Sequence, residues 1–186
     1  VSGGQSFFQR KEIKDVTSYI RLLANPDDDV SLLRVINTPR RGIGRRTLEI
    51  LIETAQATGT SLFGAIAAEL HAADSHLGKR AQADLASFHD LVERYRPLIF
   101  SPRKMAEHLR ALVDEIDYWA HLVAEHPTND KAAKWKFRNI GLFLDFVEQY
   151  ERDPDNLSPS PFEFLTRTTL DSRDDVDDEK NQGKVN

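Results

Sequence analysis

Apolar residues recur at helical spacing along most of this chain, and no other feature constrains its fold as strongly. They fall three, four or seven residues apart, which places them on one face of an α-helix. Strand signals are almost absent, because only Gln5–Phe8 could be extended and nothing nearby could pair with it. We therefore predict a compact all-α domain of about eight helices. The apolar stripes are Ile13, Ile20 and Leu23; Leu48, Leu51, Ile52 and Ala55; Leu85, Phe88, Leu91, Val92 and Tyr95; Met105, Leu109, Leu112 and Val113; and Phe137, Ile140, Leu144 and Val147.

Proline and capping residues predict where these helices begin and end. Asn25-Pro26 ends the first helix, because the residue before proline disfavours helical backbone angles. Asp27-Asp28-Asp29 follows at once, and these carboxylates are expected to cap the next N-terminus instead of binding a cation. Ser101-Pro102 and Ser160-Pro161 each combine a capping serine with a first-turn proline, which predicts a helix start at both places.

Composition limits the class of protein. The 186 residues suffice for one main domain, and a net charge of -5 argues against a basic coat over the whole surface. Any contact with nucleic acid must therefore come from a local patch. The absence of cysteine excludes disulfide frameworks, thiolate zinc sites and cysteine nucleophiles, and fits a reducing cytoplasm. No apolar run approaches the roughly 18 residues that a membrane span requires.

The two ends differ from the centre of the chain. Val1 is not an initiator methionine and no signal peptide follows it, so we interpret the chain as a piece of a longer protein. Residues 171–186 contain no aromatic side chain and cannot bury enough surface to offset the entropy of ordering. We expect a flexible acidic linker there; its acidic residues after Asp171 are Asp174, Asp175, Asp177, Asp178 and Glu179.

The charge pattern around residues 37–47 is the strongest functional signal. No acidic residue occurs between Asp29 and Glu49, although the chain as a whole is acidic. A concentrated positive patch of this kind is typical of a surface that contacts nucleic acid. The arginines of the patch are Arg34, Arg40, Arg41, Arg45 and Arg46.

The backbone of the same stretch predicts a phosphate-binding turn between two helices. Gly42 and Gly44 permit positive φ and the close approach of a phosphate, and the next helix directs its free N–H groups toward that point. We expect Ile43 to insert between the two helices, as in helix-hairpin-helix elements. Such a turn holds the DNA backbone without reading the base sequence. The alternative is a glycine-rich helix connection whose arginines are merely solvated.

A weaker basic candidate lies on a later helix. Lys131, Lys134 and Arg138 share one helical face and could contact DNA, although charged helix faces are usually just solvated. Trp119 and Trp135 lie in apolar helical stretches, so we expect both in the core and give them no binding role.

Enzymatic motifs are missing. The chain has no Gly-x-x-x-x-Gly-Lys-Ser/Thr loop, and Gly78-Lys79 lacks the upstream glycine and the following hydroxyl. Histidines five residues apart, such as His121 and His126, diverge on a helix and do not converge on a metal. We predict no catalytic, cofactor-binding or metal-binding residue in this chain.

Several segments, taken in order, resemble the UvrD/Rep/PcrA-like superfamily 1A DNA helicases. The likeness is densest in the first third and weaker afterwards, where Lys136, Arg138 and Asn139 are similar to a basic helix of that family. The segments that carry it are residues 3–15 (GGQSFFQRKEIKD), 19–29 (YIRLLANPDDD), 33–39 (LRVINTP) and Gly42-Ile43-Gly44.

The resemblance implies an architecture. Residues 1–15 would close a segment of the second RecA-like domain, called 2A, with Glu12 to Asp15 at the crossing. Residues 16–170 would form the helical insertion called subdomain 2B, and residues 171–186 would return to 2A. In the family the Gly-Ile-Gly turn contacts duplex DNA ahead of the fork, and this implies DNA binding by Thr38, Arg40, Arg41, Gly42, Ile43, Gly44, Arg45, Arg46 and Thr47.

The resemblance also implies a function for the parent protein. It would be a bacterial, cytoplasmic and nucleoid-associated 3′-to-5′ helicase of DNA repair or replication that uses ATP and Mg²⁺. This chain would supply duplex docking and regulation at a junction of single and double strands, beside other subdomains of the same helicase, and would be inactive alone. Two alternatives stay open: a protein-interaction module for repair or replication proteins, and a stand-alone helix-hairpin-helix DNA-binding domain.

Overall fold

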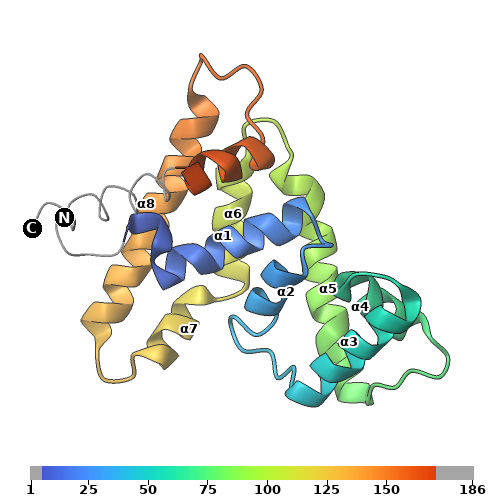
Figure 1. Cartoon of the computed structure of the whole chain (residues 1–186). Coiled ribbons are helices and arrows are strands. Elements are labelled where there is room, and N and C mark those ends of the chain that lie inside the picture. Colours follow the sequence, from blue (N-terminus) through green and yellow to red (C-terminus); the bar gives the residue numbers. More distant parts are fainter. Residues whose placement is uncertain (1–5, 171–186) are drawn as a thin grey trace, which may run out of the picture.

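The computed structural model describes residues 6–170, and every regular element in that range is helical (Figure 1). The predicted all-α class is confirmed. Phe7 lies in the one segment whose sequence would have allowed an extended conformation, and it begins a short 3-10 helix. The elements are η1 (Phe7–Gln9), α1 (Lys11–Ala24), α2 (Asp29–Val35), α3 (Arg45–Thr58), α4 (Leu62–His71), α5 (Lys79–Ile99), α6 (Met105–Glu115), α7 (Tyr118–Glu125), α8 (Asp130–Arg152) and a further helical segment at 161–170.

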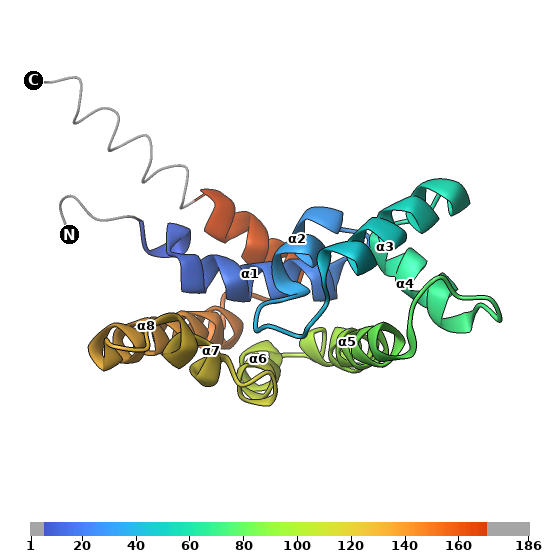
Figure 2. The ribbon, with the colours of Figure 1, turned by 90° about the horizontal axis from the view of Figure 1, so that it is seen from below.

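The helices form two layers with α1 at the centre. Figure 2 shows α5, α6, α7 and α8 in one layer, and α1, α2 and the segment 161–170 in the other. Ile13, Ile20, Leu22 and Leu23 of α1 are fully buried between these layers. Helix α3 packs on α4, and α4 packs on α5, away from both termini of the described chain (Figure 1).

Two buried carboxylates of α1 tie this helix to both layers. Asp15 is paired with Arg34 of α2 at 3.0 Å and accepts a hydrogen bond from the Tyr118 hydroxyl of α7 at 2.6 Å. Glu12 accepts a hydrogen bond from the Asn139 amide of α8 at 3.1 Å. Burial raises the pKa of Tyr118, and the neighbouring Asp15 adds to that effect. The expected boundary after residue 15 therefore falls inside one continuous, well-anchored helix.

Most of the predicted helix ends are confirmed. Helix α1 ends at Ala24, and Asp28 caps α2 by accepting a hydrogen bond from the Ser31 N–H at 3.0 Å. The adjacent Asp29 accepts from the Leu62 N–H at 2.9 Å, so it supports the start of α4. Ser160 caps the segment 161–170 through the Glu163 N–H at 3.2 Å. Residues 171–186, where we expect the acidic linker, lie outside the described residues.

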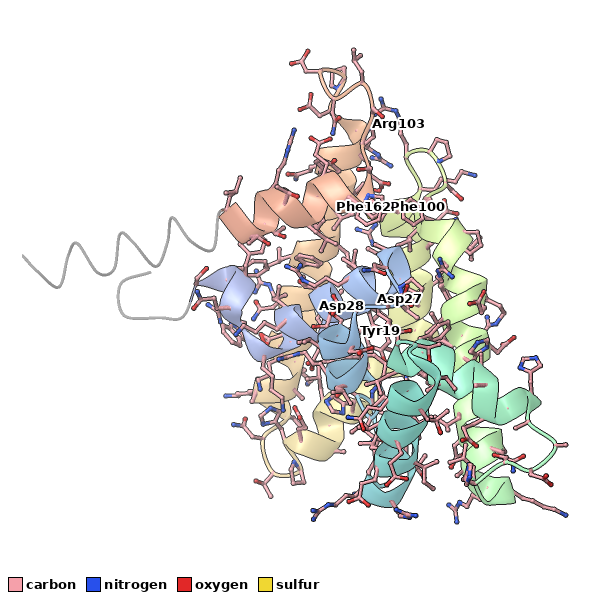
Figure 3. The ribbon with its side chains drawn as sticks, turned by 45° about the vertical axis from the view of Figure 1, so that its right-hand side comes forward. Tyr19, Asp27, Asp28, Phe100, Arg103 and Phe162 are labelled. Carbon is pink, nitrogen blue, oxygen red and sulfur yellow. The ribbon has the colours of Figure 1, made fainter. Side chains whose placement is uncertain are left out.

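The predicted helix start at Ser101-Pro102 is wrong. The chain makes a turn there, Arg103 takes a φ of 56°, and α6 begins only at Met105. The buried carboxylate of Glu151 on α8 accepts hydrogen bonds from the Met105 and Ala106 N–H groups and so caps α6 from 45 or more residues away. Arg103, labelled in Figure 3, donates to the Glu151 and Asn156 carbonyls and fixes the turn.

The expectation that both tryptophans are buried is also wrong. Trp119 is 37% exposed and Trp135 is 50% exposed. On α8 the interior is filled by Phe143 and Leu144, whereas Trp135 lies outside it. No helix among residues 6–170 has both the length and the apolar character needed to cross a bilayer.

A buried carboxylate also organises the connection after α4. Glu69 accepts hydrogen bonds from Thr54, from the Ser75 hydroxyl and from both the backbone and ring nitrogens of His76. Burial opposes ionisation of Glu69, but these donors outweigh it and lower its pKa to about 2. This network fixes the loop that joins α4 to α5.

Candidate nucleic-acid interface

The predicted turn joins α2 to α3, and its two glycines differ in what they contribute. Gly42 has a φ of 75°, a conformation that disfavours any side chain with a Cβ. Gly44 has a φ of -82°, and a Cβ added there would meet no atom within 4 Å, so its backbone accepts other residues. Ile43 between them is 4% exposed and belongs to the core, as we predicted. The apolar side chain therefore fixes the turn while the two glycines stay at the surface.

Asn37 holds the turn together and was missed by the sequence analysis. Its side-chain oxygen accepts hydrogen bonds from the Ile43 N–H at 3.2 Å and, more weakly, from the Arg41 N–H at 3.4 Å. Its amide nitrogen donates to the Ile43 carbonyl at 2.5 Å. An asparagine directly after a helix is a known signal for such backbone bridging, and it could have indicated this role.

Arg41 points into the protein. Its guanidinium donates to the Val35 carbonyl at 2.6 Å, the Ile36 carbonyl at 3.0 Å and the Tyr19 hydroxyl at 2.6 Å, and it also lies over the Phe88 ring. These carbonyls are the last acceptors of α2, so the cation stabilises the helix C-terminus. We therefore treat Arg41 as a residue that positions the turn and not as a phosphate contact.

Tyr19 of α1 is the second residue that positions the turn and that the sequence analysis did not identify. Its hydroxyl donates to the Thr38 carbonyl while accepting from Arg41. Burial raises the pKa of the Tyr19 hydroxyl, and the Arg41 guanidinium opposes that rise. Figure 3 shows Tyr19 in the middle of the molecule, beside α2. The pose of the turn therefore depends on the central helix.

Three arginines of the patch face outward. Arg40 is exposed and has no ion pair within residues 6–170. Arg45 and Arg46, whose side chains are 94% and 72% exposed, share Glu49 at 3.2 Å and 3.5 Å. Exposed pairs of this kind contribute about 0 to 1 kcal/mol, so a phosphate can compete for both guanidinium groups. Arg34, in contrast, is held by the buried Asp15.

The N-terminus of α3 adds donors to these charges. No side chain caps it, and its first turn contains no acidic residue. Its first N–H groups and the positive end of the helix dipole therefore lie free beside Arg45 and Arg46. Thr47 is half-buried in this first turn, whereas the Thr38 hydroxyl donates to the Arg34 carbonyl at 2.9 Å. Of the two threonines, Thr47 is the better placed to face a ligand.

The fold also brings acidic residues close to a turn that is free of them in sequence. A side chain added at Gly42 would meet an Asp84 oxygen of α5 at 3.6 Å. A hollow of about 520 Å³ separates the turn from α7, with Arg40 and the glycines on one side and Glu125 on the other. Partial burial opposes ionisation of Glu125, but the hydrogen bond from the Lys11 ammonium and the other positive groups nearby together outweigh it and hold the Glu125 pKa below its usual value. Lys11 thereby also offsets the negative charge facing the turn.

The weaker candidates lie on a different surface. Lys131, Lys134 and Arg138 are all exposed on the first half of α8. Helix α7 lies between α8 and the α2–α3 turn in both views (Figures 1 and 2). The structure therefore does not join these three cations to the arginine patch.

Comparison with known proteins gives a consistent result. The profile of the UvrD-like helicase C-terminal domain matches residues 1–186. ATP-dependent DNA helicase Rep of Escherichia coli (strain K12) is 35% identical over 171 residues, which is 91% of this chain and 25% of that protein. ATP-dependent DNA helicase PcrA of Bacillus subtilis (strain 168) is 31% identical over 188 residues, 98% of this chain and 23% of that protein. The chain thus spans about a quarter of the length of these curated relatives.

Proposed function

This chain belongs to the UvrD-like helicase C-terminal domain family, and from that membership and the α2–α3 turn we propose that it anchors duplex DNA for an ATP-dependent helicase. The observation that carries the proposal is the outward group of Arg40, Arg45 and Arg46 around the uncapped N-terminus of α3. Cations and free N–H groups at one point suit a backbone phosphate.

The mechanism we propose is electrostatic. The turn grips phosphates of the duplex ahead of the fork, so that the motor pulls one strand against a held duplex. Asn37, Tyr19 and Arg41 keep the turn in place through their hydrogen bonds, and binding therefore requires little reorganisation. Because phosphate contacts carry no base information, the anchor is independent of sequence.

The parent enzyme in this proposal is a 3′-to-5′ helicase of DNA repair or replication. Residues 1–15 and 171–186 connect to the second RecA-like domain, and residues 16–170 form its helical 2B insertion. The chain contains no phosphate-cradling Gly-x-x-x-x-Gly-Lys-Ser/Thr loop, and we place the binding of ATP and Mg²⁺ in other parts of the parent. In this proposal the chain binds duplex DNA while the parent unwinds it, and it has no ATPase activity alone.

Substituting Gly44 tests the proposal without disturbing the fold. Gly44→Asp places a carboxylate at the N-cap of α3, where it stabilises the helix by a few tenths of a kcal/mol but repels a phosphate. A repulsion of about 1 to 4 kcal/mol at contact distance corresponds to a loss of duplex affinity of roughly 5- to 900-fold. Fluorescence anisotropy with a labelled blunt duplex measures this loss.

Gly44→Asn is the matched control. Asparagine caps the helix as aspartate does and has nearly the same shape, but it carries no charge. We expect it to keep duplex affinity within about threefold of the original chain, which is less than 1 kcal/mol. Equal affinities of the Asp and Asn variants would contradict phosphate binding at this helix end.

A further inference from the structure

The exposed face of α8 around Trp135 combines an aromatic ring with unpaired positive charge. Trp135 is 50% exposed, although a buried tryptophan would remove far more apolar surface from water. Lys131 precedes it by four residues and Arg138 follows it by three, so all three lie on one side of the helix. Lys134 is its direct neighbour in sequence and is also exposed.

Positive charge exceeds negative charge on this face, although the first turn of α8 also contains the exposed Asp130. Lys131, Lys134 and Arg138 form no ion pair within residues 6–170. No acidic residue occurs from Lys131 to Leu144, whereas the second half of α8 contains Asp145, Glu148 and Glu151. Three cations without an ion pair, beside a single carboxylate, fit a polyanionic ligand on a chain whose net charge is -5.

The Trp135 ring is in contact with a further cation, Arg10. The guanidinium carbon of Arg10 lies 4.4 Å from the centre of the Trp135 ring, a cation–π contact that fixes the indole and covers part of it. Half of the side chain still faces solvent. A fixed, half-open aromatic ring flanked by cations is the arrangement that binds unpaired bases by stacking, with their phosphates on the neighbouring charges.

We propose that this face of α8, defined by Arg10, Lys131, Lys134, Trp135 and Arg138, binds single-stranded nucleic acid. A base stacks on the open side of Trp135, and the adjoining phosphates contact Lys131, Lys134 and Arg138. Because α7 separates this face from the α2–α3 turn (Figure 2), the surface is distinct from the duplex anchor and does not depend on it. One chain could then bind the double-stranded and the single-stranded part of a junction at the same time.

Intrinsic fluorescence tests the stacking directly. The chain has two tryptophans, so Trp119→Phe leaves Trp135 as the only one. An oligothymidylate of about 12 nucleotides is expected to quench this fluorescence, whereas polyglutamate of equal charge leaves it unchanged. Equal quenching by polyglutamate, or no quenching by the oligothymidylate, would overturn the proposal. The first of these results would indicate an acidic protein as the partner.

Affinity measurements separate the ring from the general charge. Trp135→Ala should weaken oligothymidylate binding about 5- to 150-fold, the effect of losing one base stack, and Trp135→Phe should restore most of it. Leu142→Ala is the control, because Leu142 is 48% exposed on the same helix but has no aromatic ring. If Trp135→Ala and Leu142→Ala bind equally well, the proposal is wrong. Gly44→Asp should leave oligothymidylate binding intact, which distinguishes failure here from failure of the duplex anchor.

Discussion

Replacing Arg40, Arg45 and Arg46 together with alanine is expected to weaken duplex binding about a hundred- to a thousandfold at about 0.1 M salt. Each arginine that neutralises a phosphate releases condensed counterions and contributes roughly 0.9 log units of affinity per tenfold dilution of salt. Three such contacts therefore contribute roughly 2.7 log units at that salt concentration relative to 1 M. Titration of a labelled duplex with the triple variant measures the loss.

The triple Arg→Lys variant is the control for this experiment. Lysine preserves the charge, so most of the affinity should remain, while the two-pronged geometry of arginine is lost. The fold should tolerate both variants, since the three side chains are exposed and the pairs of Arg45 and Arg46 with Glu49 contribute little. A triple alanine variant that binds duplex as tightly as the original chain would show that the patch is only solvated.

Glu151→Ala is expected to destabilise the fold by about 2 to 6 kcal/mol. The substitution leaves the Met105 and Ala106 N–H groups buried without acceptors, at a cost of about 1 to 3 kcal/mol for each group. It also removes a negative charge from the positive end of α6. Urea unfolding followed by circular dichroism measures the change in the free energy of unfolding.

Glu148→Ala provides the comparison on the same helix. Its carboxylate forms exposed pairs with Arg152 at 3.0 Å and Arg110 at 3.8 Å, and such pairs contribute about 0 to 1 kcal/mol. We expect its free energy of unfolding to stay within about 1 kcal/mol of the original value. Similar losses for the two variants would mean that Glu151 does not act as the cap of α6.

Features that are local in sequence could be predicted well. Ile13 and Ile20 follow from helical spacing, and the cap at Asp28 follows from the run of aspartates after Pro26. The Ser101-Pro102 start failed because the acceptor for α6 comes from Glu151, which is distant in sequence. Capping rules describe only neighbouring residues, so they cannot identify such a partner.

In the candidate site, too, local features could be predicted from the sequence, whereas contacts between distant residues could not. The cluster of arginines and the inserted Ile43 follow from residue types and spacing. Whether an arginine points outward depends on partners that folding supplies: Arg41 turns inward because Tyr19 and the end of α2 provide acceptors. Asp84 likewise reaches the turn only through packing of α5. A sequence pattern gives the charge of a patch but not the direction of each side chain.

The salt dependence of duplex binding tests the phosphate anchor most directly. With three outward arginines, a plot of log affinity against log salt concentration should have a slope of about -3 or steeper for the original chain. The triple alanine variant at Arg40, Arg45 and Arg46 should lose about 2.7 units of that slope. Duplex binding that does not respond to salt, or an identical slope for the two proteins, would contradict the account.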